Sequence, residues 1–277
     1  MTGSGPTAWH VLRGSVRGLN KKFNQDSLYT ASVADGAALV LSVADGHGSA
    51  AHFRSNMGSR WAVREFADCV TPFARTVVDR QEDPTTWLAL FAAARALAGP
   101  ICHRWRERAL LYEAGHPANG AAAGERNPTR ADLIPYGTTL LGLVVTQQLL
   151  FCWQVGDGDI TTSADAGAPP RRPLATAEEE YGDDTDSLCE PEPWVKMRVH
   201  CQPMAPLGPR PLLIANTDGL SKSFEDERGY LKFATDVHSA LERQGIDKVR
   251  LLLEGWLTRA AGKSGDDTTL VGVYAGE

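Results

Sequence analysis

The chain has 277 residues and a formal net charge of −6 at pH 7, and 43% of its residues are hydrophobic. This length suits one large domain or two small ones, and this hydrophobic content can form a substantial core. The charge argues against a basic nucleic-acid-binding face, and five cysteines without CxxC spacing argue against a zinc site or a disulfide framework.

The N-terminal residues 1–18 lack the apolar core of a secretory signal. No uninterrupted apolar run in the chain approaches the roughly 18 residues of a membrane-spanning helix. We therefore expect a cytoplasmic protein that does not contact a membrane.

Short apolar runs bounded by polar or turn-forming residues predict buried strands at five places in the chain. These runs cover residues 38–44, 139–145, 149–155, 212–215 and 270–274. Gln147 and Gln148 lie between the second and third runs and predict a tight turn. The sequence therefore predicts an antiparallel hairpin there.

Apolar residues at three- and four-residue steps predict three helices. One stripe runs from Trp87 to Trp105 and indicates a single long helix. A second stripe starts at Phe53 and includes Trp61, and a third covers residues 249–257 with Trp256. We expect the tryptophans of these stripes to lie in the core.

Two segments are typical of loops rather than of helices or strands. Residues 115–130 are rich in Gly, Ala, Pro and Asn, and residues 163–193 combine a Pro/Arg-rich stretch with an acidic run. The acidic run is best interpreted as a solvated face. Because no repeat and no linker is visible, we expect a single domain over residues 1–277. It would carry a flexible insertion near 115–130 and a second insertion near 163–193.

Aspartates stand at the boundaries of several predicted strands, most of them next to glycine. They are Asp26 in FNQDSL, Asp45 in SVADGHGS, Asp157 in QVGDGDI, Asp218 in IANTDGLS, and Asp266 with Asp267 in KSGDDTTL. Asp-Gly alone is a common turn dipeptide. Several carboxylates that converged would repel one another unless hard cations such as Mg²⁺ or Mn²⁺ neutralised them. The repeated pattern favours such a metal site, although spacing alone does not show convergence.

In this order, the motifs NQDS, VADGHGS, YGTTL, VGDGDI, NTDGL and GDDTTL resemble those of the metal-dependent (type 2C) protein serine/threonine phosphatases, bacterial branch. The resemblance spans about Gly14–Tyr274. It implies an α+β fold, a four-layer α/β/β/α sandwich in which two stacked antiparallel sheets are flanked by helices. It also places the insertion near 163–193 where the family has a variable flap beside the active site.

The resemblance further implies roles for individual residues around two Mg²⁺ or Mn²⁺ ions. Asp45 would bridge the ions, Gly46 would contribute its carbonyl, and Asp218 and Asp266 would complete the coordination of one ion. Asp266 is preferred over Asp267 because it stands three residues before Thr269, as in the family's Asp-x-x-Thr pattern. The remaining implied roles are Asp26 at or beside the other ion, Asp157 at a third ion, and His47 as general acid.

Three positions depart from the family pattern. Gln25 stands where many members have Glu, and Asp159 replaces the arginine of the GDSR motif. Lys21 takes the place of an arginine that grips the substrate phosphate, and Arg17 or Lys22 would be the substitutes. Since lysine lacks the bidentate fork of arginine, these changes bear on substrate affinity more than on metal binding.

The function implied by the resemblance is hydrolysis of phosphoserine or phosphothreonine in proteins by attack of a metal-bound water. Its partners would be phosphorylated proteins, such as a serine/threonine kinase or its targets. The alternative is a catalytically weak phosphatase fold that acts as a partner-binding regulatory module. Lys21 and Gln25 favour that alternative, and the intact aspartates oppose it. A nuclease-like two-metal hydrolase is opposed by the acidic charge.

Overall fold

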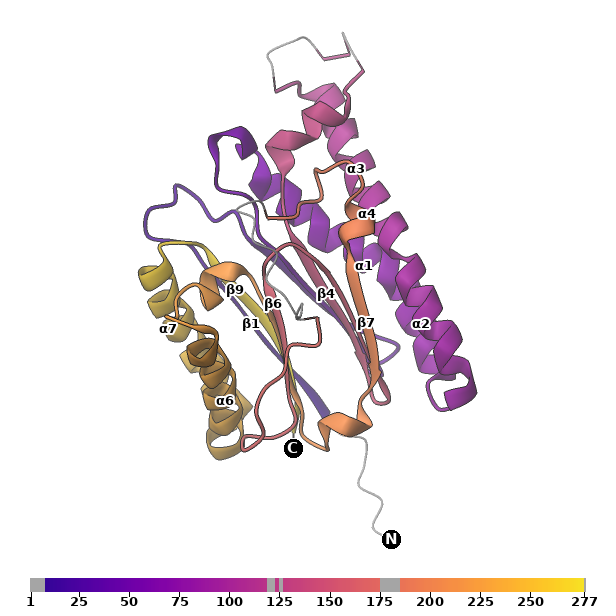
Figure 1. The fold of residues 1–277 in the computed structure, drawn as a ribbon, viewed down its shortest axis with the longest axis vertical. Helices are drawn as coiled ribbons and strands as arrows, with labels where there is room; N and C mark the ends of the chain where they lie inside the picture. Colours follow the sequence, from indigo (N-terminus) through magenta and orange to yellow (C-terminus); the bar gives the residue numbers. More distant parts are fainter. Residues whose placement is uncertain (1–7, 119–122, 125–126, 175–184, 277) are drawn as a thin grey trace.

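Two antiparallel sheets form the centre of the molecule (Figure 1). The computed structural model describes residues 8–118, 123–124, 127–174 and 185–276. The four-stranded sheet has the order β1 (Ala8–Val16), β9 (Thr268–Gly276), β8 (Leu212–Asn216) and β6 (Asp159–Ser163). The five-stranded sheet has the order β2 (Ser27–Val33), β3 (Ala38–Ala44), β4 (Leu140–Thr146), β5 (Leu149–Val155) and β7 (Arg198–Pro203).

Helices cover the outer face of each sheet. The five-stranded sheet packs against α1 (Ser55–Arg80), α2 (Trp87–Ala96) and α3 (Ala98–Gly115). The four-stranded sheet packs against α6 (Glu227–Gln244) and α7 (Ile246–Ser264). The shorter helices are η1 (Ala50–His52), η2 (Pro84–Thr86), η3 (Arg130–Tyr136), α4 (Pro193–Lys196), η4 (Ala205–Leu207) and α5 (Asp218–Ser221). The predicted four-layer α/β/β/α sandwich is confirmed.

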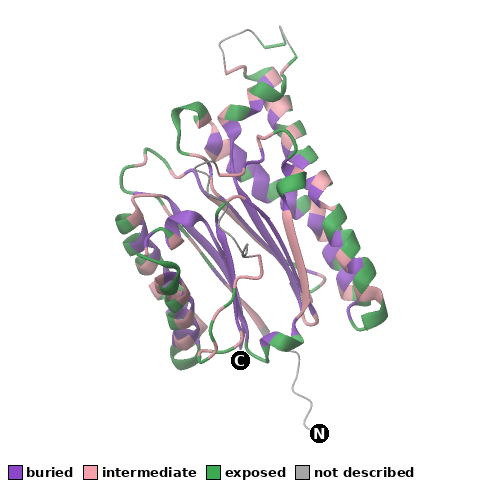
Figure 2. Ribbon diagram, in the orientation of Figure 1, coloured by how far each residue is buried: buried purple, intermediate pink, exposed green. Residues whose placement is uncertain are grey.

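Hydrophobic side chains fill all three spaces between these layers. Figure 2 shows that most residues of the central strands are buried. Leu41, Leu143 and Val271 lie between the two sheets. Trp105 and Trp153 are fully buried between the five-stranded sheet and its helices. Because most strands are buried on both faces, their sequences are continuous apolar runs rather than alternating patterns.

The predicted strands agree well with the observed ones. β3 and β5 have the predicted bounds, β4 is shifted by one residue, and β8 and β9 extend beyond the predicted runs. The hairpin at Gln147 and Gln148 is confirmed, because β4 and β5 pair antiparallel with Val145 opposite Leu150. Sequence patterns missed β1, β2, β6 and β7. All four lie at sheet edges, and β2 and β7 are mostly half-buried.

The prediction of one long helix from Trp87 to Trp105 is wrong. Two helices occupy this segment: α2 ends at Ala96, and the amide of the next residue, Leu97, donates a hydrogen bond to the carbonyl of Ala94. Pro100 explains the break, because proline has no amide hydrogen for the carbonyl of Ala96 and its ring collides with that carbonyl. The apolar stripe continues across the break, so periodicity did not reveal it.

The other two helical stripes are confirmed with changed boundaries. Phe53 precedes α1 and is 52% exposed, because the helix begins only at Ser55. Residues 249–257 lie within α7. Trp61 and Trp105 belong to the core as expected, whereas Trp87 and Trp256 are only half-buried.

The two predicted insertions lie between regular elements. Between α3 and η3, and between β6 and α4, the described residues contain no helix and no strand. Residues 119–122, 125–126 and 175–184, which include most of the acidic run, lie outside the described part of the chain.

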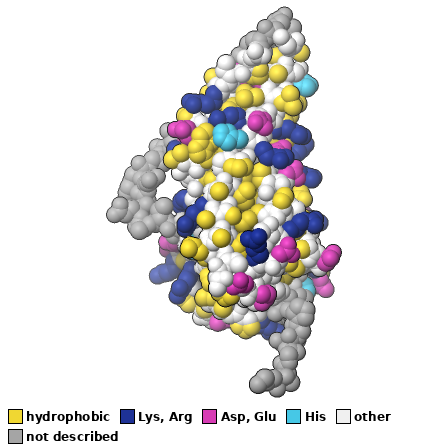
Figure 3. Space-filling model, turned by 90° about the vertical axis from the view of Figure 1, so that its right-hand side faces the viewer, with side chains coloured by type: hydrophobic (Ala, Val, Ile, Leu, Met, Phe, Trp, Pro, Cys, Tyr) yellow, Lys and Arg dark blue, Asp and Glu magenta, His cyan; other side chains and the backbone are white. Residues whose placement is uncertain are grey.

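The helical layer over the five-stranded sheet exposes apolar side chains. Figure 3 shows this side of the molecule, with hydrophobic side chains in a band between charged ones. Leu88, Leu111 and Val195 are each more than 70% exposed. By length and composition alone, one helical stretch in the described residues, Pro84–Gly115, could cross a membrane. In this fold the stretch comprises η2, α2 and α3, which lie side by side with α1 and the sheet.

Candidate metal and phosphate site

Four of the predicted site aspartates are held at strand boundaries that meet at one end of the sandwich. Asp26 precedes β2 and Asp45 follows β3, and these strands pair with Ser27 opposite Ala44. Asp218 follows β8, and Asp266 precedes β9, the neighbour of β8. The pairing of strands therefore brings together carboxylates that are up to 240 positions apart in the chain.

Hydrogen bonds connect these segments across the two sheets. The Thr217 hydroxyl donates to Oδ2 of Asp26 at 2.8 Å and accepts from the amide of Thr269 at 3.0 Å. The carboxyl group of Asp45 lies close enough to those of Asp26 and Asp218 for their charges to raise its pKa. Side chains from β2, β3, β8 and β9 thus form one connected polar cluster.

Crowding of the carboxylates changes their proton affinity. Burial, followed by the charges of Asp26 and Asp218, raises the pKa of Asp45 well above its usual value. Burial also raises the pKa of Asp26 to about 7. Burial opposes the ionisation of Asp218, but its neighbours Asp45 and Lys222 outweigh burial and lower its pKa. Asp45 therefore holds a proton more tightly than an ordinary aspartate does, because its neighbours are buried carboxylates.

Two buried oxygens in the cluster suit a hard divalent cation. Oδ1 of Asp26 and Oδ1 of Asp218 are inaccessible to solvent and have no hydrogen-bond partner. Buried carboxylate oxygens normally have partners, and oxygen ligands of this kind are those that Mg²⁺ and Mn²⁺ prefer. Within the described residues, however, no group of three or more His, Cys, Asp or Glu side chains is placed so that it could hold a metal ion.

Two lysines lie against the carboxylates. The Lys21 ammonium is 2.6 Å from Oδ1 of Asp266. The Lys222 ammonium contacts the carboxylate of Asp218 and is 3.6 Å from Oδ2 of Asp157. Burial alone would lower the pKa of both lysines, but hydrogen bonds and charges from their carboxylate partners have the larger effect and raise the pKa of each. Both therefore carry full positive charge at neutral pH.

The neighbours Asp266 and Asp267 have different surroundings. Asp267 is buried, and its two oxygens accept hydrogen bonds from the amides of Gly18 at 2.8 Å and Gln25 at 2.7 Å. The Asp266 side chain is 33% exposed and faces Lys21. Oδ1 of Asp266 also accepts a hydrogen bond from the amide of Asp267 at 2.8 Å. Asp267 therefore fixes the segment that carries Lys21, while Asp266 keeps Oδ2 for a cation.

The turn after β3 is tightly packed at Gly46. A Cβ atom there would lie 2.7 Å from the carbonyl oxygen of Gln25 and 2.8 Å from that of Ser55. The side-chain amide Nε2 of Gln25 donates to the His47 carbonyl at 3.1 Å and to the Ser55 hydroxyl at 2.6 Å. Only glycine fits this position, and Gln25 serves as a clamp on the turn.

His47 is largely uncharged at neutral pH in this environment. Burial, together with repulsion from His52, lowers the pKa of His47 to about 4. The two rings are 4.8 Å apart in an edge-to-face arrangement. A general acid must hold its proton before transfer, so this environment disfavours that role until an anion binds nearby.

Three further predicted residues lie at the margin of the cluster or outside it. Asp157 contacts Lys222 and accepts a hydrogen bond from the Thr185 hydroxyl at 3.0 Å. Asp159, which replaces the family's arginine, pairs at 3.1 Å with Arg172 of the insertion after β6. Arg17 is exposed and donates to the carbonyl of Lys22 at 3.0 Å, away from the carboxylates.

Sequence patterns missed the parts played by Lys222, Thr217 and Asp267. Lys222 had a usable signal, because it stands four residues after Asp218 and such residues share one face of a helical turn. Thr217 and Asp267 had none, since their partners are distant in the chain.

The sequence matches the family described as protein phosphatase 2C over residues 13–258. The chain belongs to this family. The match covers Asp26, Asp45, Asp157 and Asp218, whereas Asp266 lies beyond it. No curated protein matches the chain significantly.

Solved protein phosphatase 2C structures share the fold of this chain. The serine/threonine phosphatase of S. agalactiae has a TM-score of 0.59 and 17% identity, with 97% of this chain and 100% of the other covered. PppA of Pseudomonas aeruginosa, a regulatory component of the T6SS, has a TM-score of 0.59 and 18% identity over 98% and 99% of the chains. The catalytic domain of PstP, solved with two manganese ions, has a TM-score of 0.57 and 18% identity over 96% and 97%.

Proposed function

We propose that this protein phosphatase 2C chain is a divalent-metal-dependent phosphatase acting on phosphoserine or phosphothreonine in proteins. The observation that supports this most strongly is the pair of buried, unpartnered oxygens on Asp26 and Asp218 beside Asp45. The substrates would be phosphorylated proteins, including a serine/threonine kinase or its targets, in the cytoplasm.

The residues that would hold Mg²⁺ or Mn²⁺ are those that converge from four strands. Asp45 is the proposed bridging ligand, because the charges of both Asp26 and Asp218 act on its carboxyl group. Asp266 and the Gly46 carbonyl complete the proposed set. Bound divalent ions would neutralise the carboxylates and the phosphoryl group and would activate a water nucleophile.

Two ions fit the cluster better than three. Asp157 is the proposed ligand of a third ion, but the Lys222 ammonium already lies between Asp157 and Asp218. A lysine there supplies one positive charge at the edge of the cluster and repels a further divalent ion.

Lys21 is the proposed contact for the substrate phosphate. Its ammonium lies beside Asp266 and close to Gly48 of the β3 turn, with the side chain 24% exposed. Arg17 makes its side-chain hydrogen bond outside the cluster. When a phosphate dianion binds, it would also raise the pKa of His47 and allow that side chain to protonate the departing alkoxide.

The decisive experiment is hydrolysis of p-nitrophenyl phosphate and of a phosphothreonine peptide across a Mn²⁺ titration. We expect turnover that depends on Mn²⁺ and is lost in Asp218→Asn. Lys248→Ala is a matched control, because Lys248 is exposed and lies outside the cluster. Turnover that is unaffected by EDTA, or retained by Asp218→Asn at saturating Mn²⁺, would contradict the proposed function.

The partner-binding alternative has one structural observation in its favour. Lys21 and Lys222 already balance charges that a metal would otherwise balance. In that case wild-type protein would bind Mn²⁺ weakly and release no phosphate from either substrate, while remaining folded.

A further inference from the structure

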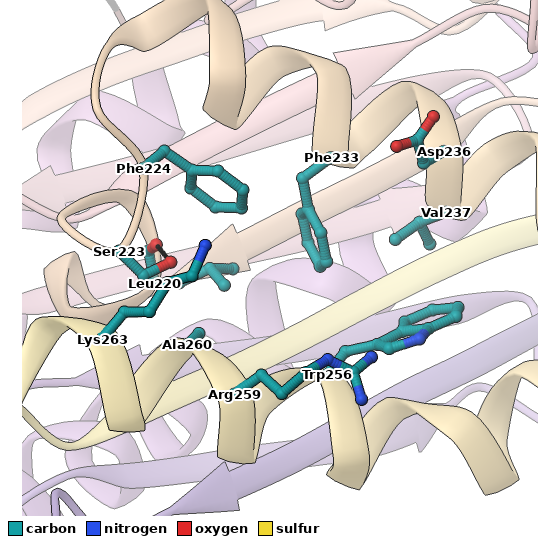
Figure 4. Close-up of a pocket in the computed structure, with 10 residues that line it drawn as sticks. All are labelled: Leu220, Ser223, Phe224, Phe233, Asp236, Val237, Trp256, Arg259, Ala260 and Lys263. Carbon is teal, nitrogen blue, oxygen red and sulfur yellow. Dashed lines mark hydrogen bonds between the residues drawn. The ribbon is translucent and has the colours of Figure 1, made fainter.

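An aromatic pocket with a basic rim lies in the helical layer that covers the four-stranded sheet (Figure 4). Its volume is about 320 Å³, at the lower end of the range for ligand sites. The pocket lies between the α5 turn, α6 and α7. Leu220, Val237 and Ala260 are buried at its base.

Three aromatic rings form the walls of this pocket. Phe224 and Phe233 have ring centroids 5.7 Å apart, and Phe233 meets Trp256 edge-to-face at 6.4 Å. All three side chains are half-buried, so each keeps apolar surface in contact with solvent. The pocket can therefore accept one large apolar side chain.

The rim of the pocket carries cations that lack partners. Arg259 and Lys263 of α7 are exposed, and neither makes a hydrogen bond or an ion pair within the part of the chain that the structure describes. Figure 4 shows Lys263 reaching toward the α5 turn and Arg259 beside Trp256. The rim's acidic residue, Asp236, is paired with Lys232 at 2.6 Å.

The pocket also borders two of the segments that carry proposed metal ligands, those of Asp218 and Asp266. Leu220 follows Asp218 on the α5 turn, and Lys263 precedes Asp266 at the end of α7. A peptide in the pocket would therefore lie close to the phosphate site without occupying it.

We propose that this pocket docks an acidic segment of phosphoprotein substrates, with a large apolar side chain in the pocket and carboxylates on Arg259 and Lys263. The acidic character of the occupant follows from charge complementarity, because the two unpaired charges on the rim, those of Arg259 and Lys263, are positive although the chain has a net charge of −6. This inference rests on the proposed function, but binding of the segment can be measured without turnover.

The first test uses the fluorescein-labelled peptide Glu-Glu-Leu-Gly-Phe-Glu-Glu in a fluorescence polarisation assay. We expect binding to wild-type protein and about two- to thirtyfold weaker binding to the double variant Arg259→Glu/Lys263→Glu, the range for two exposed charge pairs. Lys248→Glu on the same helix is the matched control and should bind like wild type. A peptide with lysine at every glutamate position should not bind.

The second test links docking to substrate choice. A phosphothreonine peptide extended by the acidic segment should have a lower KM than one extended by the lysine segment, with equal kcat. The double variant should lose this difference, and its hydrolysis of p-nitrophenyl phosphate should equal that of wild type. Absence of p-nitrophenyl phosphate turnover in wild type would defeat the proposed function and would leave the binding test intact.

Three results would overturn the docking proposal. The first is absence of peptide binding by wild-type protein, and the second is equal binding by the double variant. The third is a wild-type dimer in sedimentation experiments that dissociates in the double variant, since a second copy of the chain would then occupy the pocket.

Discussion

Replacing Asp267 should destabilise the fold, whereas replacing the adjacent Asp266 should affect metal binding alone. The Asp267 carboxylate is buried and accepts two backbone hydrogen bonds, from Gly18 and Gln25. A hydrogen bond to a charged group contributes about 1.5–3 kcal/mol. Asp267→Ala should therefore lower the free energy of unfolding by about 3–5 kcal/mol, and Asp267→Asn, which keeps one acceptor, by about half as much.

Asp266 offers the contrast within the same turn. Its side chain is one-third exposed and its main contact is the ion pair with Lys21. An exposed pair of this kind contributes about 0–1 kcal/mol, and removing Asp266 also removes a negative charge that acts on Asp45. Asp266→Ala should leave the unfolding free energy of the metal-free protein within about 1 kcal/mol of wild type.

Urea unfolding of the metal-free proteins, followed by tryptophan fluorescence, measures the first effect. Isothermal titration with Mn²⁺ measures the second. We expect Asp267→Ala to unfold at clearly lower urea, and Asp266→Ala to unfold like wild type but to bind Mn²⁺ at least tenfold more weakly, a loss of about 1.4 kcal/mol. The reasoning would be refuted if Asp267→Ala were as stable as wild type, or if Asp266→Ala bound Mn²⁺ normally.

Three further predictions address the cations and the pH dependence. Lys21→Ala should raise KM for a phosphothreonine peptide and lower kcat/KM, with a loss of transition-state stabilisation of about 1.5–3 kcal/mol. Lys21→Arg should recover part of this loss, and unchanged kinetics in Lys21→Ala would exclude the contact. Lys222→Ala should bind Mn²⁺ about two- to fivefold more tightly, because a competing cation is removed from Asp218. Calorimetry with Lys248→Ala as the control measures this affinity, and weaker Mn²⁺ binding by Lys222→Ala would show that Lys222 supports the site. Burial lowers the pKa of His238 despite Glu242, so its neutral form is favoured in the fold. Because the unfolded state then binds the proton more readily, the contribution of neutral His238 to stability should be lost as pH drops below about 6.5. Wild type should therefore lose stability relative to His238→Gln between about pH 7.5 and 5, and a constant difference between their urea curves over this range would contradict the prediction.

The sequence alone determined the layers of the fold and the identity of the acidic motifs. β3 and β5 were predicted to the residue, because strands buried on both faces are continuous apolar runs that end at polar residues or turns. The aspartates could be singled out because an Asp at a strand boundary next to Gly is a local pattern. The break between α2 and α3 was also encoded locally, at Pro100, but the apolar stripe continued through it.

Only the tertiary structure decided how these residues meet. The contact from Thr217 to Asp26, the burial of Asp267 and the ion pairs of Lys21 and Lys222 depend on strand order and on helix packing. Local pattern cannot set distances between segments that lie far apart in the chain. The pocket beside Trp256 shows the same limit, because the helical stripe predicted a core residue and the spacing of α6 and α7 left one side of the ring open to solvent.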